Sequence, residues 1–143
     1  MVAAEDAGKV GAADKLGIEP GMVVAEFGWG EDVDEDVREA IEDRIDGEML
    51  DEEADDVLDV VVLWWREDDG DLVDALVDVT SPLAENGVIW VLTPKSGRDG
   101  HVQPAEIAEA VPTAGLAQTS NISVGPDWNG TRLVSPKSAK SRR

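Results

Sequence analysis

The chain has 143 residues, 42% of them hydrophobic, and its 32 acidic and 12 basic residues give a net charge of −20. This length is enough to bury one substantial core, so the composition predicts one globular domain. The absence of cysteine excludes disulfides, thiolate metal ligands and cysteine nucleophiles, and a single histidine, His101, excludes a zinc site built from several histidines.

The first half of the chain predicts a strand followed by a helix. Residues 1–15 are small and polar without periodicity, which predicts a disordered segment. A turn over residues 17–21 leads into the apolar run 22–27, which is typical of a buried strand. After the glycine turn GWG, apolar residues recur every fourth position and predict a helix that Gly47 ends; these residues are Val33, Val37, Ile41 and Ile45. Residues 48–56 are ambiguous and favour one short strand with a turn.

The second half predicts two further strong strands, two helices and a hairpin. Residues 57–65, VLDVVVLWW, form the most strand-like run, and residues 88–94, VIWVLTP, form a third strand. Between them an apolar stripe predicts a helix over residues 72–83, closed by ENG. After a flexible loop, Pro104 suits the first position of a short helix over 104–111. Residues 118–125 and 130–136 are expected to form an antiparallel hairpin that contains Trp128 in its connecting loop.

This alternation of strands and helices predicts an α/β fold. We expect a Rossmann-like three-layer sandwich with a mostly parallel central sheet and a C-terminal antiparallel hairpin. The single domain is expected over residues 16–136, between the disordered segment 1–15 and a basic disordered tail at 137–143.

Ligands of open parallel sheets bind outside the carboxyl ends of the strands, so the loops after the three strong strands are the candidate site. The first loop, EFGWGEDV, lacks the third glycine of the G-x-G-x-x-G fingerprint. Five carboxylates at the start of the following helix would also repel a pyrophosphate. The sequence therefore argues against a phosphate-binding turn, but it leaves room for a neutral or cationic ligand.

The segment VVAEFGWG followed by a helix resembles motif I of the Rossmann-like methyltransferases that use S-adenosylmethionine. Residues 57–65 are similar to the fourth strand of that family, and residues 83–94 are similar to the junction between the next helix and the fifth strand. The resemblance implies that the cofactor turn is formed by Glu26, Gly28, Trp29 and Gly30. The chain departs from the pattern at Trp29 and Asp32, and only Asp51 is available as the acidic residue that grips the ribose.

A second resemblance covers residues 16–137. GWGEDVDEDVREAIED, LWWREDDGDLVDALVD, GVIWVLTPKSGRDGHVQPAEIAEA and DWNGTRLVSPK are similar, in order, to an uncharacterised actinobacterial family of domain-of-unknown-function proteins. That resemblance implies an intracellular single-domain protein and supplies no reaction.

Aromatic and basic residues near the same three loops are candidates for a ligand or partner crevice: Trp65, Arg66, Lys95, Arg98, His101 and Trp128. Each basic residue has an alternative interpretation, in which it pairs with the protein's own carboxylates. His101 is a candidate for proton transfer because histidine is the side chain type best suited to exchange protons near neutral pH, but no nucleophile or electrophile is identified beside it. The acidic runs do not follow the calcium-loop pattern, so no metal site is predicted.

Negative charge is concentrated between Glu31 and Asp78, where 22 acidic residues face only three basic ones. Such a surface repels nucleic acid and anionic membranes, so neither is an expected partner. It is interpreted either as a solubility device or as a docking surface for a basic partner. No apolar run is long enough to cross a membrane and no signal peptide is recognised, which predicts a cytoplasmic protein.

Three functions remain open from the sequence. The first is a non-catalytic or catalytically degenerate Rossmann-like domain that acts by binding a small molecule or a partner segment. The second is a minimal S-adenosylmethionine-dependent methyltransferase, because methyl transfer needs little beyond positioning. The third is an acidic interaction module that docks a basic partner.

Overall fold

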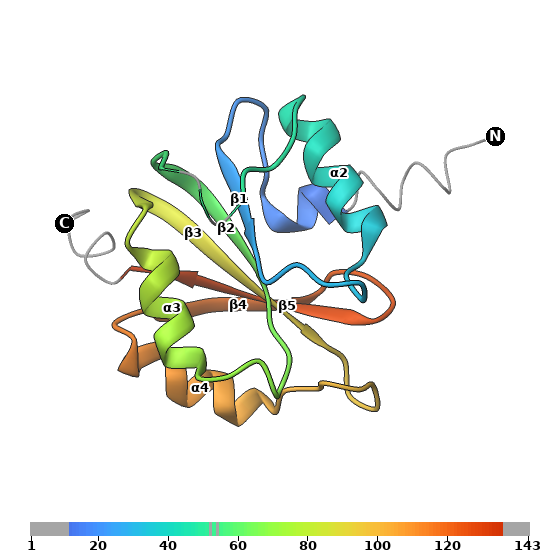
Figure 1. Cartoon of the computed structure of the whole chain (residues 1–143), viewed down its shortest axis with the longest axis vertical. Coiled ribbons are helices and arrows are strands. Elements are labelled where there is room, and N and C mark those ends of the chain that lie inside the picture. Colours follow the sequence, from blue (N-terminus) through green and yellow to red (C-terminus); the bar gives the residue numbers. More distant parts are fainter. Residues whose placement is uncertain (1–11, 52, 54, 136–143) are drawn as a thin grey trace.

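Five strands form one sheet in the computed structural model, which describes residues 12–51, 53 and 55–135 (Figure 1). The strands are β1 (Val24–Phe27), β2 (Leu58–Trp64), β3 (Leu83–Pro94), β4 (Ala117–Ser123) and β5 (Trp128–Val134), in the order β1-β2-β3-β5-β4. β1, β2 and β3 pair in parallel, whereas β5 is antiparallel to both β3 and β4. The expected parallel sheet with a terminal antiparallel hairpin is therefore confirmed.

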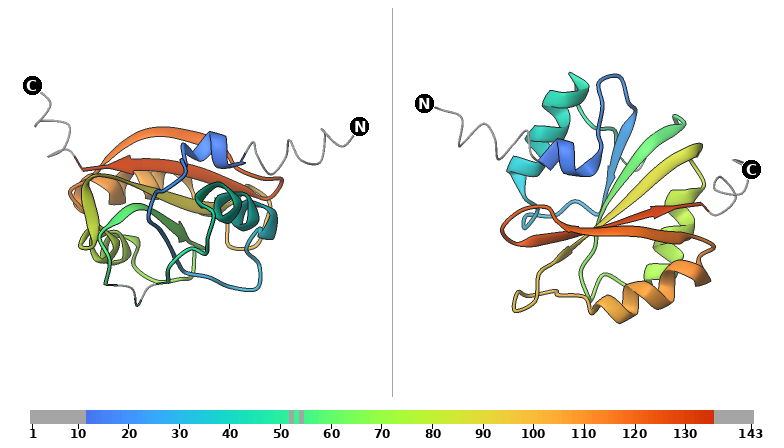
Figure 2. Two further views of the ribbon diagram at one scale, coloured as in Figure 1. Left: turned by 90° about the horizontal axis from the view of Figure 1, so that it is seen from above. Right: turned by 180° about the vertical axis from the view of Figure 1, so that it is seen from behind.

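The helices cover both faces of this sheet. α2 (Glu35–Ile45) packs on one face, and α3 (Leu72–Thr80) and α4 (Pro104–Thr113) pack on the other, as Figure 2 shows from behind. Alternate residues of β2 accordingly enter different cores: Val62 and Trp64 face α2, whereas Leu63 faces α3. A strand buried on both faces reads as a continuous apolar run, which is why residues 57–65 were so strongly strand-like.

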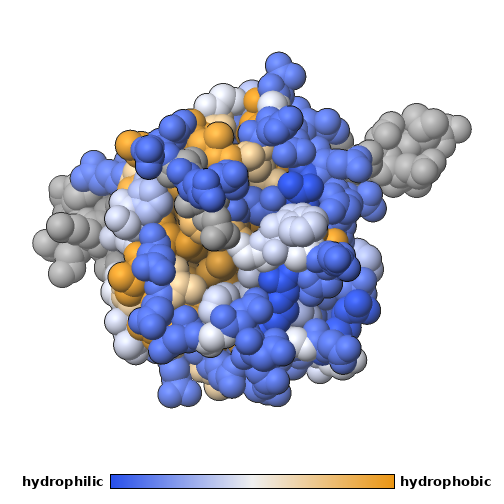
Figure 3. Space-filling model, in the orientation of Figure 1, coloured by the Kyte–Doolittle hydropathy of each residue, from blue (hydrophilic) through white to orange (hydrophobic). Residues whose placement is uncertain are grey.

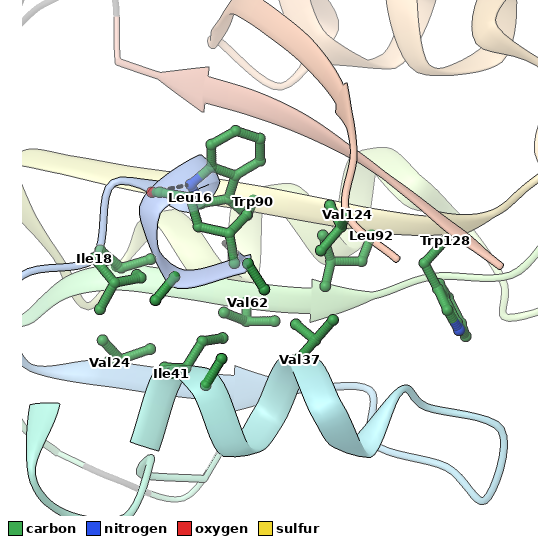
Figure 4. Close-up of a cluster of buried hydrophobic side chains, with 14 of the residues drawn as sticks. Leu16, Ile18, Val24, Val37, Ile41, Val62, Trp90, Leu92, Val124 and Trp128 are labelled. Carbon is green, nitrogen blue, oxygen red and sulfur yellow. Dashed lines mark hydrogen bonds between the residues drawn. The ribbon is translucent and has the colours of Figure 1, made fainter. Parts of the chain in front are cut away.

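The core on the α2 face joins the sheet to the N-terminal segment (Figure 4). Val37 and Ile41 of α2 meet the sheet residues Val24 and Val62. The Trp90 indole, which is 2% exposed, donates its Nε1 hydrogen to the Leu16 carbonyl oxygen at 2.9 Å. This hydrogen bond satisfies the polar atom of a buried aromatic side chain and ties the segment before β1 to the middle of the sheet.

The ordered structure begins earlier than the sequence predicts. Residues 12–16 are helical, and Ala12 and Ala13 are buried against the same core. The prediction of disorder is therefore wrong for residues 12–15, because small apolar side chains find a buried surface that local composition does not reveal. Residues 1–11 and the tail 137–143 lie outside the described residues.

Some element ends also differ from the expectation. The second helix ends at Thr80, and β3 begins at Leu83, because Leu83 pairs with Leu58 of β2 and ENG continues the strand. α2 ends at Ile45, where Asp46 adopts a left-handed conformation with φ of 57°. The expected short strand at 48–56 is reduced to a single parallel bridge between Leu50 and Ala25. No helix of the described residues is long and apolar enough to cross a membrane.

Candidate functional site

The glycine turn after β1 is a tight backbone approach to β2. Gly28 has φ of 76°, and a Cβ atom there would run into the carbonyl oxygen of Trp64. Glycine at this position is therefore required by both conformation and space. After the turn, the Asp34 carboxylate accepts hydrogen bonds from the backbone N–H groups of Asp36 and Val37 and begins α2.

Glu26 lies at the end of β1 and points toward α2. Its carboxylate accepts hydrogen bonds from Arg38 Nε at 2.6 Å, Arg38 Nη2 at 2.9 Å and Trp64 Nε1 at 2.8 Å. The hydrogen bond to Glu26 is the main cause of the raised pKa of Arg38. Both carboxylate oxygens of Glu26 are thus engaged within the protein, on the side of the sheet that α2 covers.

Arg66 covers the glycine turn. Its Nη1 donates to the Gly28 carbonyl oxygen at 2.6 Å, and its Nε donates to Asp32 at 3.1 Å. Asp69 accepts from the Arg66 backbone N–H and lies 3.3 Å from Nη1. A Cβ atom on Gly30 would come within 2.8 Å of the Arg66 guanidinium. The space that a side chain at position 30 would need is therefore occupied by the Arg66 guanidinium.

Trp65 and Trp128 lie on opposite faces of the sheet and do not line one crevice. Trp128 was expected in a loop, but it begins β5, is 3% exposed, and packs edge-on against Trp64 with ring centroids 4.8 Å apart. The Arg66 guanidinium lies 5.5 Å from the Trp128 ring centroid. Trp65 belongs to the core on the α3 face.

The loop after β3 lies at the same edge of the sheet, and its lysine, its arginine and its histidine have partners within the chain. Lys95 donates to Ser123 Oγ at 2.6 Å, and Arg98 pairs with Asp127 at 3.0 Å. The Nδ1 atom of His101 lies 2.9 Å from the Pro94 carbonyl oxygen. The Glu67 backbone N–H donates to the Gly100 carbonyl oxygen at 2.9 Å, which holds this loop beside Arg66. The loop thus lies beside Arg66 at Gly100, and the side chains of Lys95, Arg98 and His101 each contact the protein's own groups.

A pocket of about 310 Å³ remains open on the α3 side of the turn. It is lined by Phe27, Gly28, Trp29, Leu63, Trp64, Trp65, Arg66, Asp69, Ala75, Asp78 and Val79. Trp29 is 56% exposed and is the most accessible aromatic side chain of this lining. Of the residues predicted for the site, Gly28, Trp29, Trp65 and Arg66 line the pocket, whereas Glu26, Gly30, Lys95, Arg98, His101 and Trp128 do not.

The sequence did not predict that α3 forms one wall of this pocket. Ala75, Asp78 and Val79 lie in the first two turns of that helix, remote in sequence from the glycine turn. Their pattern indicates an amphipathic helix, and no local signal marks Asp78 as a pocket residue. Among the described residues, no group of three or more histidine, aspartate or glutamate side chains is arranged to hold a metal ion.

Asp32 is expected to give the site a pH-dependent contact. Its hydrogen bond with Arg66 lowers the pKa of Asp32 below its ordinary value of 3.8. The stabilisation is therefore present above pH 3.8 and is lost as pH falls through the lower folded-state pKa. Because the Asp32 side chain is 53% exposed, Asp32→Asn should cost only about 0.5 kcal/mol at neutral pH.

Urea unfolding measured at pH 7 and at pH 3 tests this expectation. The difference between Asp32→Asn and the parent chain should shrink at the lower pH. Asp68→Asn removes a neighbouring charge that makes no ion pair among the described residues, so it serves as the control. An equal effect of both substitutions at both pH values would contradict a specific contact with Arg66.

Comparison with solved structures identifies the class of fold. A SAM-dependent methyltransferase from Aquifex aeolicus aligns with a TM-score of 0.57 at 15% identity, over 87% of this chain and 88% of that one. The glycopeptide N-methyltransferase MtfA aligns at 0.61 and 15%, over 90% and 96%. An O-methyltransferase of neocarzinostatin biosynthesis, solved with S-adenosyl-L-homocysteine, aligns at 0.60 and 13%, over 80% and 49%. At these identities the likeness shows a shared Rossmann-like methyltransferase fold and no more.

The sequence identifies the family. Residues 13–137 match the model described as "Protein of unknown function (DUF3052)", so the chain belongs to the DUF3052 family. Uncharacterised proteins of Mycobacterium bovis and Mycobacterium tuberculosis are 57% identical over 143 residues, covering 100% of this chain and 89% of theirs. The whole-chain resemblance to an actinobacterial family of unknown function is thereby confirmed.

Proposed function

We propose that this protein is a non-catalytic binding domain of methyltransferase-like fold that takes a small adenosyl-type molecule in the pocket beside the glycine turn, acting in the cytoplasm. The observation that carries the proposal is the position of Arg66. Its guanidinium occupies the space beside Gly30 and pairs with Asp32, so no ligand can enter the turn at that point. The pocket beside the turn stays open. The ligand is thus received next to the turn, against Trp29 and α3.

The pocket lining suits a planar ligand that is neutral or positively charged. Its volume of about 310 Å³ lies at the lower end of the range of small-molecule sites. Trp29 and Phe27 offer aromatic surface for stacking, and Asp69 and Asp78 offer acceptors for hydroxyl or amino groups. Arg66, the one cation among the described residues of the lining, already pairs with Asp32 and Asp69, so none of these residues offers a phosphate a free positive charge.

The side chains that chemistry at this edge would need are engaged in structural contacts. His101 contacts the Pro94 carbonyl oxygen, Lys95 contacts Ser123, and Glu26 holds Arg38 and Trp64. This engagement supports a binding or regulatory role over catalysis. A side chain that already makes a hydrogen bond in the folded protein must break that hydrogen bond before it can transfer a proton.

A specific observation favours the alternative of a minimal methyltransferase. Leu50 hydrogen-bonds to both sides of Ala25, with its N–H donating to Val24 at 2.9 Å and its carbonyl accepting from Glu26 at 2.8 Å. Asp51, the residue after Leu50, therefore lies beside the carboxyl end of β1. This is where the methyltransferase resemblance implies the carboxylate that grips the ribose, and positioning alone is enough to promote methyl transfer.

Calorimetric titration with S-adenosylmethionine and S-adenosylhomocysteine tests the proposal. We expect saturable binding in the micromolar range, and Trp29→Ala should weaken it by about tenfold because the stacking surface is lost. Val77→Ala is the matched control, since Val77 is half exposed on α3 but does not line the pocket.

Each outcome has a distinct meaning. Absence of binding by the parent chain would overturn the adenosyl ligand, and equal binding by Trp29→Ala would overturn the pocket. Slow conversion of bound S-adenosylmethionine to S-adenosylhomocysteine in the presence of a mixture of small-molecule acceptors would replace the non-catalytic role with the methyltransferase alternative.

A further inference from the structure

A second hollow, of about 620 Å³, lies between α3 and α4, away from the glycine turn. It is lined by Trp65, Glu67, Gly70, Asp71, Leu72, Val73, Val102, Glu106, Glu109, Ala110 and Thr113. The two helices lie side by side in Figures 1 and 2, and Figure 3 shows hydrophobic atoms over the region of α3, flanked by hydrophilic ones. The groove therefore runs between two helices and has an apolar floor.

Among the residues that the structure describes, the four ionisable residues of this lining are all acidic. Glu67, Asp71, Glu106 and Glu109 are exposed at its rim. Asp71 caps α3 through the backbone N–H groups of Val73 and Asp74. In the part of the chain that the structure describes, Glu67, Glu106 and Glu109 have no ion-pair partner. Their negative charge is thus available to a partner.

The residues of α4 that line the groove have the spacing expected of one helical face, as a surface that contacts another helix would have. Glu106, Glu109, Ala110 and Thr113 follow one another at i, i+3, i+4 and i+7, which places them on one face. The stretch 106–113 spans about 10 Å along the helix axis, or two helical turns. Opposite them, Leu72 and Val73 of α3 offer half-buried apolar side chains. An elongated occupant of helical shape fits this arrangement.

We propose that this groove docks a basic amphipathic helix of another protein, with apolar side chains against Val73 and Trp65 and with lysine or arginine facing Glu106 and Glu109. Charge complementarity selects this occupant. A second copy of the chain would bring another net charge of −20 toward the acidic rim. The chain's own tail, KSAKSRR, is basic but has only Ala139 as an apolar residue, so it does not match the floor.

The probe for the test is a fluorescently labelled peptide of leucine and lysine, about four turns long, with leucines on one helical face. Fluorescence anisotropy would follow its binding to the full chain at ionic strengths of about 0.02 M and 0.3 M. Glu106→Gln/Glu109→Gln should weaken binding by about tenfold at the lower ionic strength. Asp36→Asn/Asp43→Asn makes the same charge change on α2, across the sheet, and should weaken it by less than about twofold.

Val73→Ser separates docking in the groove from attraction to the whole acidic surface. It changes no charge and leaves a half-buried position, so the chain should fold, and binding should weaken by about threefold. An unchanged affinity of Val73→Ser, or equal losses in the two charge variants, would overturn the groove as the site.

Two further results would assign the groove to another occupant and overturn the proposal. One is a dimer in light scattering that Val73→Ser dissociates, which would make a second copy the occupant. The other is a gain of affinity of about tenfold on removal of residues 138–143, which would mean that the chain's own tail competes for the groove.

Discussion

Replacing Glu26 by alanine is expected to lower the free energy of unfolding by about 3 kcal/mol, because the substitution leaves both Arg38 and Trp64 Nε1 without their buried acceptor. The Glu26 side chain is 8% exposed, whereas Arg38 is 23% exposed, so water recovers part of the loss at the arginine. Urea unfolding followed by tryptophan emission measures the change. Tryptophan emission reports on the substitution directly, because the Trp64 indole loses its hydrogen bond to Glu26.

Two companion variants separate the contributions of charge and hydrogen bonding. Glu26→Gln retains an acceptor for Trp64 and should cost roughly 1–2 kcal/mol. Glu35→Ala removes the exposed partner of the same arginine and should cost about 0.5 kcal/mol. If Glu26→Ala were no more harmful than Glu35→Ala, the carboxylate would not be a structural group, and its assignment to a cofactor would regain support.

Gly28→Ala is expected to lower the free energy of unfolding by about 3 kcal/mol, for two additive reasons. The left-handed conformation at φ of 76° is costly for a residue with a side chain, and the new Cβ would meet the Trp64 carbonyl oxygen. The ends of β1 and β2 would have to separate to relieve this clash. The same movement would disturb Arg66, which donates to the carbonyl oxygens of both Gly28 and Trp64.

Gly97→Ala is the matched control for this substitution. Gly97 has a similar φ of 89°, but a Cβ atom there meets nothing within 4 Å. It should therefore show the conformational cost alone, about 1 kcal/mol. Thermal unfolding of both variants would decide the matter, and equal shifts in midpoint would show that the contact with Trp64 contributes nothing.

The two variants together bear on the meaning of the glycine turn. In the sequence, EFGWG favours a cofactor loop, and the methyltransferase neighbours have the same fold. In the structure, Gly28 accommodates the Trp64 backbone, Gly30 accommodates Arg66, and Glu26 anchors α2. Glu26, Gly28 and Gly30 thus each have an internal structural reason that explains them before any ligand is considered, whereas Trp29 of the same motif stays 56% exposed.

The predictable part of the molecule was the part governed by local pattern. The apolar run of β2, the four-residue spacing in α2 and the proline at the start of α4 all identify elements from neighbours in sequence. Because the side chains of a strand alternate between faces, the adjacent Trp64 and Trp65 enter different cores. The class of fold followed from the order of these elements.

What failed from the sequence depended on partners distant along the chain. Leu83 looked like the end of a helical stripe, yet pairing with Leu58 makes it the start of β3. Trp128 looked like a loop residue, yet contact with Trp64 buries it. For Arg66 and Arg98 the sequence left both an ion pair within the protein and a contact with a ligand open, since both interpretations require the same residue type in the same loop.

The amino-acid sequence alone was sufficient for the α/β class, the mostly parallel sheet, the family and the acidic character, because periodicity, composition and similarity are properties of the chain. Only the tertiary structure decided which side chains meet. It paired Arg66 with Asp32 across 34 positions, turned Glu26 toward Arg38, and left open a pocket beside Trp29 and an acidic groove between α3 and α4. A pocket is space that distant segments leave unfilled, and no local pattern encodes it.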